Sequence, residues 1–172
     1  MNTGSKEDVL GETTAVQRVS GLTALKENSC LMANNCKRRL LIYSHRLRAD
    51  IYNQLCFSDA VRNLSIRHAN TRILILVVDT TELVRGGSPL VRFSQTMPSS
   101  VEIRRRPEEF DSDQRSFMLA DERGYILRNL WNNLDNIQMG SNNPIEVRSL
   151  AEDFMHVWEQ SLPDPDLRQL HI

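Results

Sequence analysis

"TRILILVVD", residues 71–79, is the stretch that decides the fold. Its core is a continuous apolar run rich in β-branched residues, which is typical of a strand buried on both faces. A second such run, "LLIYS", occupies residues 40–44, and residues 50–69 between the two carry an apolar stripe at helical spacing. Strand, helix and strand in this order predict a βαβ unit with parallel strands.

The rest of the chain continues this alternation of helices and strands. Helical spacing of apolar residues predicts a helix over 13–35 and a final helix over 145–162, and Pro89 begins a short helix. Residues 100–107 alternate like an edge strand, and 115–128, "RSFMLADERGYILR", read as two strands around a tight turn. The amide-rich segment 129–144 is predicted to be an irregular loop.

Composition indicates one soluble domain with short flanking segments. The chain has 172 residues, 40% hydrophobic and 25% charged, and a net charge of −1, which gives no overall attraction to nucleic acid or anionic membranes. We expect a disordered N-terminus over 1–12, a domain over 13–162 and a C-terminal tail over 163–172. No apolar run is long enough to span a bilayer, and the N-terminus lacks the apolar core of a signal peptide.

The number and spacing of the cysteines indicate the cellular compartment. Cys30, Cys36 and Cys56 are odd in number and form no Cys-x-x-Cys pair. This pattern suits free thiols in a reducing environment rather than a disulfide framework. Together with the absence of an apolar leader, it predicts a cytoplasmic protein.

Several segments resemble one half of a phospholipase D superfamily domain. They are "IYSHRL" (42–47), "ANTRILILVVD" (69–79), "MPSSVEIRRR" (97–106) and "SFMLADERGYILR" (116–128). The resemblance covers roughly residues 20–160 and implies an α/β fold: a single half domain whose mixed β-sheet has helices on both faces. Since halves of this superfamily normally pair, it also implies a homodimer or a partner protein.

A second resemblance is to a proteobacterial domain of unknown function that is sometimes attached to acetyltransferases. The closing stretch "PDPDLRQLHI", residues 163–172, contributes to it. The chain has no R/Q-x-x-G-x-G/A loop of the kind that binds acetyl-CoA. An accessory role beside an acetyltransferase is therefore one alternative, but we do not expect this chain to carry that activity itself.

The catalytic motif of the phospholipase D superfamily, His-x-Lys-x4-Asp, is lost. When its aspartate is placed on Asp121, the nucleophilic histidine falls on Gln114 and the phosphate-binding lysine on Ser116. Glutamine cannot form a phosphoramidate, and serine has no positive charge. The first residue of the glycine-serine-x-asparagine stretch that follows in the superfamily falls on Arg128. Classical phosphodiesterase activity is not expected.

Several polar residues follow the predicted strands and form a candidate pocket. His45 and Arg46 come after the first strand, Asp79 ends the second, Asp121 lies in the hairpin turn, and Arg128 closes the hairpin. Open α/β sheets bind ligands at strand ends, and guanidinium groups pair with oxyanions. We therefore predict a phosphate or carboxylate pocket. The alternative is that Arg128 pairs with Asp121 or Asp79 and that His45 is structural.

Two basic runs, Arg104–Arg106 and Lys37–Arg39, are candidate surfaces for nucleic acid or lipid headgroups. The acidic stretch "EEFDSD", 108–113, would partly cancel the first, so a solvated surface is favoured over nucleic-acid binding. The other histidines lack the spacing of metal ligands, and we expect no metal and no cofactor.

Taken together, these patterns predict a non-catalytic binding or interaction module of a cytoplasmic bacterial protein, with an anion pocket at the strand ends. A divergent phosphodiesterase or phosphoryl-transfer enzyme is the second alternative, beside the acetyltransferase accessory domain. Hydrolysis of a generic phosphodiester would separate the enzyme from the binding module.

Overall fold

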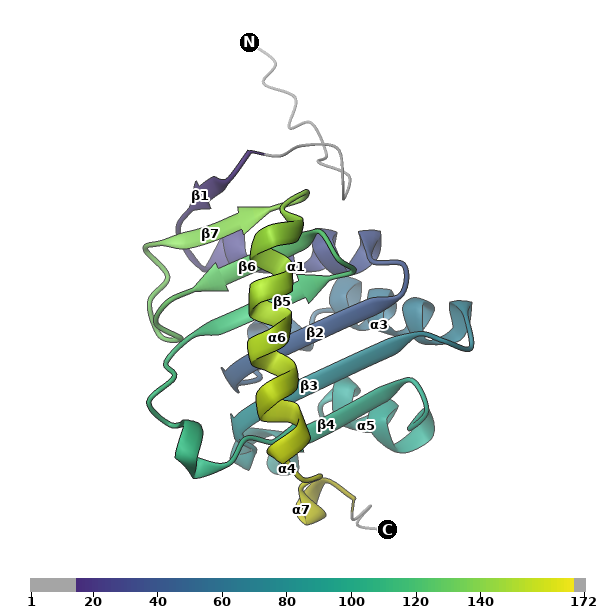
Figure 1. Cartoon of the computed structure of the whole chain (residues 1–172). Coiled ribbons are helices and arrows are strands. Elements are labelled where there is room, and N and C mark those ends of the chain that lie inside the picture. Colours follow the sequence, from purple (N-terminus) through teal and green to yellow (C-terminus); the bar gives the residue numbers. More distant parts are fainter. Residues whose placement is uncertain (1–14, 169–172) are drawn as a thin grey trace.

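The computed structural model describes residues 15–168. Its centre is a seven-stranded sheet with the strand order β1-β7-β6-β5-β2-β3-β4 (Figure 1). The strands are β1 (Gln17–Val19), β2 (Arg39–Arg46), β3 (Arg72–Asp79), β4 (Val101–Arg105), β5 (Ser116–Ala120), β6 (Gly124–Arg128) and β7 (Ile137–Gly140). The helices are α1 (Leu22–Asn35), α2 (Ala49–Tyr52), α3 (Leu55–Arg67), α4 (Thr81–Gly86), α5 (Pro89–Thr96), α6 (Pro144–Gln160) and α7 (Pro165–Arg168), with a 3-10 turn at Glu108–Phe110.

The sheet is mixed, as the sequence predicts. β2, β3 and β4 run parallel, and Leu40 of β2 lies opposite Ile73 of β3. β5 pairs antiparallel with the other side of β2, and β6, β7 and β1 continue antiparallel from it. The βαβ unit and the edge position of β4 are therefore confirmed. β2 is buried on both faces because it lies in the middle of the sheet with helices on either side.

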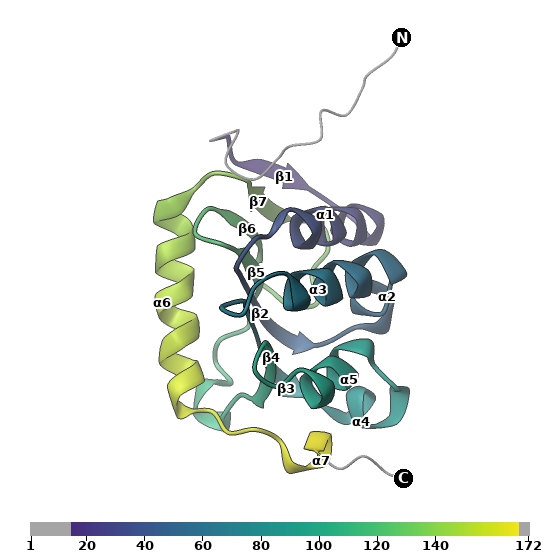
Figure 2. The same ribbon diagram turned by 90° about the vertical axis from the view of Figure 1, so that its right-hand side faces the viewer.

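Helices cover both faces of the sheet. α1 to α5 lie on one face, and α6 crosses the other (Figure 2). Side chains of β2 alternate between the two: Leu40 and Ile42 pack toward α1 and α3, whereas Leu41 and Tyr43 pack toward α6. The apolar stripe predicted for the last helix supplies the second core, with Phe154 fully buried at its centre. The predicted α/β fold with helices on both faces is confirmed.

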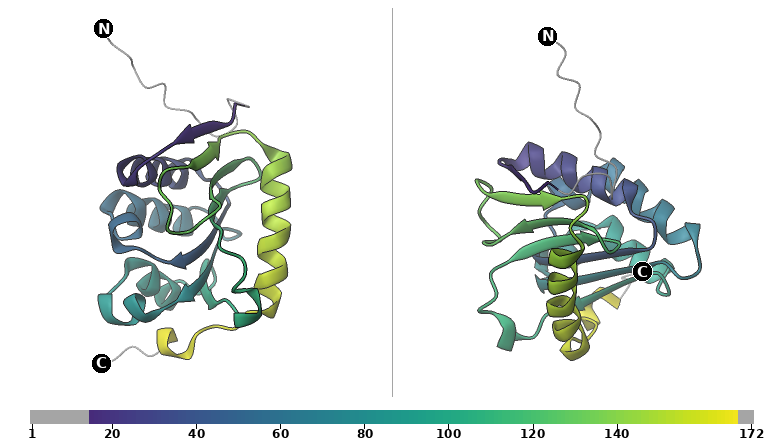
Figure 3. Two further views of the ribbon diagram at one scale, coloured as in Figure 1. Left: turned by 90° about the vertical axis from the view of Figure 1, so that its left-hand side faces the viewer. Right: turned by 45° about the horizontal axis from the view of Figure 1, so that its top comes forward.

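Two elements differ from the sequence-based expectation. Residues 17–19 form strand β1 where a helix was predicted, and α1 begins only after Gly21, whose φ of +93° favours glycine. The predicted loop 129–144 contains β7. β1 and β7 pair with each other at the edge of the sheet (Figures 1 and 3). Each is too short to give a local signal, and their pairing joins distant parts of the sequence.

The flanking segments are described only in part. The predicted disordered N-terminus, 1–12, lies outside the described residues. In the predicted tail, the Asp164 carboxylate accepts a 2.8 Å hydrogen bond from the Thr80 hydroxyl, and Leu167 is buried. The Leu167 carbonyl also accepts a hydrogen bond from Gln95 on α5. Residues 164–168 therefore pack on the domain.

The prediction of three free cysteines is wrong. Cys30 of α1 and Cys56 of α3 are joined in a disulfide with Cα atoms 6.0 Å apart. Sequence spacing gave no sign of this pair because packing of α1 beside α3 brings the residues together. Cys36 is free and buried, and burial, assisted by Asp121, raises the pKa of its thiol to about 12. Among residues 15–168, no helix has the length and apolar character to cross a membrane.

Candidate anion-binding site

The ends of β2 and β3 bring two predicted site residues together. Arg46 lies opposite Asp79 in the register, and Arg46 Nε is 3.6 Å from Asp79 Oδ2. Both side chains are about half exposed. Asp79 also accepts a 2.9 Å hydrogen bond from the backbone N–H of Thr81, which begins α4. The hydrogen bonds from Thr81 lower the pKa of Asp79, and Arg46 adds to the effect. This carboxylate is ionised at neutral pH.

His45 and Arg46 share one aromatic partner, Trp131. The imidazole of His45 stacks on the Trp131 ring with centroids 4.1 Å apart, and the Arg46 guanidinium lies 5.4 Å from the same ring. Burial lowers the pKa of His45, and the nearby charges of Arg106 and Arg46 lower it further. The imidazole is therefore neutral at pH 7. Trp131 is not among the site residues predicted from the sequence, because its contact partners are distant in the sequence.

Arg128 is a buried cation with neutral partners. Its side chain at the end of β6 is only 5% exposed. Its guanidinium donates hydrogen bonds to the Trp131 carbonyl and, over 3.1 Å, to the Ser116 hydroxyl. Burial lowers its pKa, and the charge of Arg48 adds to the lowering. Among residues 15–168 it forms no ion pair with a carboxylate, so the predicted alternative of a pair with Asp121 or Asp79 is wrong.

Asp121 does not belong to this group. β5 runs antiparallel to β2, so the turn after β5 lies beside the start of β2, at the opposite end of the sheet from Arg128. There the Asp121 carboxylate accepts hydrogen bonds from the backbone N–H groups of Lys37, Arg38 and Arg39, at 3.0, 2.8 and 3.1 Å. The prediction that Asp121 lines the same pocket as Arg128 is therefore wrong. Asp121 anchors the α1–β2 loop.

The run Arg104–Arg106 does not form a continuous basic patch. The Arg104 guanidinium lies 4.2 Å from the Trp158 ring of α6 and donates a hydrogen bond to the Trp158 carbonyl. Arg106 is only 5% exposed, and only Arg105 is open to solvent. The strand alternation of β4 and the covering by α6 separate the three side chains. The basic surface predicted from the run is therefore limited to Arg105.

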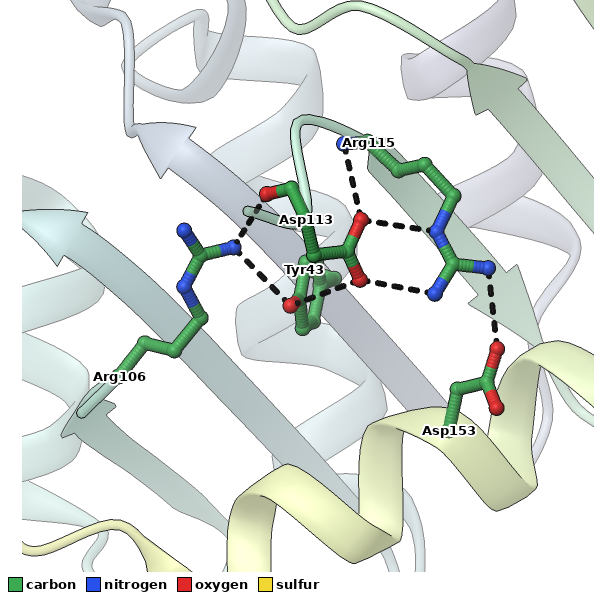
Figure 4. A network of polar contacts seen from close by, with 5 residues as sticks. All are labelled: Tyr43, Arg106, Asp113, Arg115 and Asp153. Carbon is green, nitrogen blue, oxygen red and sulfur yellow. Dashed lines mark hydrogen bonds and ion pairs between the residues drawn. The ribbon is translucent and has the colours of Figure 1, made fainter. Parts of the chain in front are cut away.

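The acidic loop before β5 forms a polar network with Tyr43 (Figure 4). The Tyr43 hydroxyl donates to Asp113 over 3.1 Å and accepts from Arg106 over 3.0 Å. Arg115 holds both oxygens of the Asp113 carboxylate and reaches Asp153 on α6. Burial raises the pKa of Tyr43 to about 12, and burial alone would also raise that of Asp113, but the hydrogen bonds from Arg115 lower it. The Asp-x-Arg spacing of residues 113–115 is a sequence signal for this network, but it was not used in the sequence-based prediction.

The described residues were also compared with the side-chain clusters that bind metal ions. Within residues 15–168, no three or more histidine, cysteine, aspartate or glutamate side chains cluster in a way that could hold an ion. His171 lies outside the described residues. The polar groups at the strand ends are two exposed or half-exposed charges, Arg46 and Asp79, a neutral imidazole and the buried Arg128. This combination suits the binding of an oxyanion.

The fold is a mixed-sheet α/β domain similar to that of phospholipase D family members. The chain belongs to the family DUF7931, a domain of unknown function, whose match covers residues 22–170. A comparison of sequences with curated proteins gave no significant match. The predicted resemblance to the phospholipase D superfamily is confirmed for the fold, and so is the resemblance to a domain of unknown function. A link with acetyltransferases stays a prediction.

Solved structures give the same fold. Nuc of Salmonella typhimurium, a phospholipase D family member, is similar with a TM-score of 0.60 and 14% identity, over 87% of this chain and 97% of Nuc. NucT of Helicobacter pylori has a TM-score of 0.62 and 8% identity, over 87% of this chain and 100% of NucT. TrmBL2, an archaeal chromatin protein described with a novel mode of DNA binding, has a TM-score of 0.65 and 15% identity, over 89% of this chain. The match spans 55% of the length of TrmBL2.

Proposed function

We propose that this domain is a non-catalytic binding module of a bacterial protein, and that it holds a phosphate or carboxylate group at the ends of β2, β3 and β6. The observation that carries the proposal is Arg128, a buried guanidinium whose recorded partners are the neutral oxygens of Ser116 and Trp131. A buried charge without a counterion costs several kcal/mol. A bound oxyanion would supply the missing charge.

The surroundings of Arg128 support an anion rather than a cation. Arg48 and Arg106 lie near enough to lower the pKa values of Arg128 and His45, although each also has a carboxylate partner, Asp50 and Asp111 respectively. Trp131 connects the groups, because its carbonyl accepts from Arg128 while its ring covers His45. A neutral imidazole keeps one N–H that can donate to an oxyanion.

Non-catalytic binding is supported by the two residues at the lost motif positions. The Gln114 amide donates to the Asp111 carbonyl. The Ser116 hydroxyl donates to the Tyr43 carbonyl over 3.2 Å and accepts from Arg128. Neither group is an activated nucleophile, since a serine nucleophile needs an adjacent general base. His45 is stacked on Trp131 rather than paired with either residue.

Inorganic phosphate is expected to protect the wild-type protein against thermal unfolding and to lose this effect in Arg128→Gln. The glutamine keeps hydrogen-bonding capacity but removes the charge that the anion would neutralise. The measurement is the melting temperature against phosphate concentration at constant ionic strength. Amide chemical shifts in an NMR titration should locate the change at residues 44–46 and 128–131.

Arg92→Gln is the matched control, because it removes one exposed arginine from α5, an element that contributes no residue to the site. It should retain the wild-type response. If Arg128→Gln is still protected by phosphate to the same extent, the pocket proposal is wrong. Hydrolysis of bis-p-nitrophenyl phosphate by the wild type, abolished in Arg128→Gln, would instead support the divergent phosphodiesterase and contradict the non-catalytic assignment.

We also propose that the domain works as a homodimer, because the superfamily that it resembles normally pairs two half domains. Leu130, which follows Arg128 in the loop after β6, is half exposed and offers apolar surface beside the site. Size-exclusion chromatography with light scattering at micromolar concentration should give the mass of two chains, about twice 19.8 kDa. A stable monomer under these conditions would contradict the dimer.

A further inference from the structure

We propose a second anion site, at the opposite end of the sheet from Arg128, that binds a compact oligophosphate, meaning two or more linked phosphate groups. The site is a pocket of about 760 Å³ between the α1–β2 loop and the β5–β6 turn. Both segments lie to the right of the centre of the sheet in Figure 1. We call it the basic pocket. Its lining residues are Asn34, Asn35, Lys37, Arg38, Arg39, Arg67, Ala120, Asp121, Glu122 and Arg123.

The charge of the basic pocket is unbalanced. Five of its lining residues are lysine or arginine, and two are acidic. Within residues 15–168 none of the five cations takes part in an ion pair, whereas Arg46, Arg48 and Arg115 elsewhere all have carboxylate partners. Within the described residues, the Arg123 guanidinium donates a hydrogen bond to one neutral oxygen, the side-chain carbonyl of Asn142, at 3.2 Å. The cations therefore remain available to a ligand.

One of the two carboxylates in the pocket is already engaged. The Asp121 carboxylate accepts hydrogen bonds from the backbone N–H groups of Lys37, Arg38 and Arg39. It therefore organises the backbone, and within residues 15–168 it forms no ion pair with the three basic side chains. Glu122 is exposed and is the remaining opposing charge.

Further hydrogen bonds hold the α1–β2 loop in place without a ligand. The Asp121 N–H donates to the Arg39 carbonyl over 2.7 Å, and the Cys36 thiol donates to that carbonyl over 3.2 Å. A site whose backbone is already ordered loses less conformational entropy when it binds. Lys37 and Arg38 of this fixed loop and Arg39 at the start of β2 line the pocket together with Arg67 of α3 and Arg123 of the turn, so part of its surface is preorganised.

The lining decides the class of ligand. It contains no aromatic side chain and one small apolar residue, Ala120, so the pocket has no aromatic ring on which a base could stack. Recognition is limited to charge and hydrogen bonds, which phosphate oxygens satisfy best. The volume lies in the range of about 300–1,000 Å³ that is usual for small-molecule sites. A compact ligand with several negative charges would match the five cations that line the pocket.

The test is a calorimetric titration of the full chain with inorganic tripolyphosphate at 0.15 M salt, with a 20-base-pair DNA duplex as a separate probe. Tripolyphosphate should bind the wild type, and the double variant Arg38→Gln/Arg123→Gln should bind at least about tenfold more weakly, since each arginine donates charge-assisted hydrogen bonds. Arg85→Gln/Arg92→Gln loses the same charge from exposed positions on α4 and α5 and should bind as the wild type does.

Each other result overturns the proposal. Equal weakening in the two double variants would mean that net charge, and not the pocket, determines binding. Duplex DNA binding that disappears in Arg38→Gln/Arg123→Gln, without tripolyphosphate binding, would make this surface a nucleic-acid contact instead. No saturable binding of either probe would leave the pocket without a phosphate ligand.

Discussion

Asp121→Ala is expected to lower the free energy of unfolding by about 3 kcal/mol, because the backbone N–H groups of Lys37, Arg38 and Arg39 would lose a shared charged acceptor. Hydrogen bonds to an ionised group are worth about 1.5–3 kcal/mol each, and part of the sum is recovered from water at this half-exposed position. Urea denaturation at pH 7, followed by circular dichroism, measures the change.

The backbone of Asp121 adds a second contribution. Its φ is +54°, in the left-handed region, where aspartate, asparagine and glycine are tolerated better than alanine. Asp121→Asn keeps an acceptor oxygen and the preference for this conformation, and should cost about 1 kcal/mol. Asp121→Gly relieves the backbone but removes the acceptor, so its cost should lie between those of the other two variants.

The order of the three variants separates the two effects. If Asp121→Gly is as stable as the wild type, the hydrogen bonds contribute little and the expected loss in Asp121→Ala is conformational strain. If all three variants unfold like the wild type, the Asp121 anchor is not important for stability. In that case the argument that the basic pocket is preorganised would also fail.

The elements that could be predicted are those with a local signal. The apolar runs of β2 and β3, the helical stripe of α3 between them and the stripe of α6 each arise from consecutive residues that are buried together. β1 and β7 could not be predicted in this way, because each is short and is stabilised by the other across most of the chain. The Cys30–Cys56 disulfide is of the same kind, since it depends on the packing of two helices.

The candidate site was predictable to the extent that strand direction was known. Arg46 and Asp79 follow two parallel strands and meet, because parallel strands end at the same edge. Asp121 follows a strand that runs the other way, and the sequence contained no signal for that direction in relation to β2. Trp131 was missed because its partners at the end of β2 meet it only in the folded chain. The residue types predicted an anion-binding site, but the direction of the strands determines which of these side chains lie close together.

Asp113→Asn is expected to lower the free energy of unfolding by about 2 kcal/mol at pH 7. Asp113 joins Tyr43 to Arg115, and its ionised carboxylate accepts two hydrogen bonds from the Arg115 guanidinium, at 2.9 and 2.8 Å. Asparagine keeps the volume but loses the charge, so Arg115 retains only Asp153 as an ionic partner. Removing one partner of a partly buried pair leaves the other charge without its counterion, which costs more than the pair itself contributes.

The pH dependence of this loss has a definite sign. The hydrogen bonds from Arg115 outweigh burial and hold the pKa of Asp113 below its usual value of about 3.9. A carboxyl group with a lowered pKa in the folded state stabilises the fold above its unfolded pKa, and this contribution disappears as the pH falls through the folded pKa. The difference between the wild type and Asp113→Asn should therefore be constant from pH 7 to about 5 and shrink below about pH 4.

Asp50→Asn is the matched control. Asp50 pairs with Arg48 two residues away, as Asp113 pairs with Arg115, but both side chains are about 40% exposed. An exposed pair contributes between about 0 and 1 kcal/mol, so this variant should stay close to the wild type. An Asp113→Asn effect no larger than that of Asp50→Asn, or one that does not change between pH 5 and 3, would mean that Tyr43 and Arg115 are held by packing alone. The Arg106–Tyr43–Asp113 connection would then be dispensable for joining β2 to the end of β4.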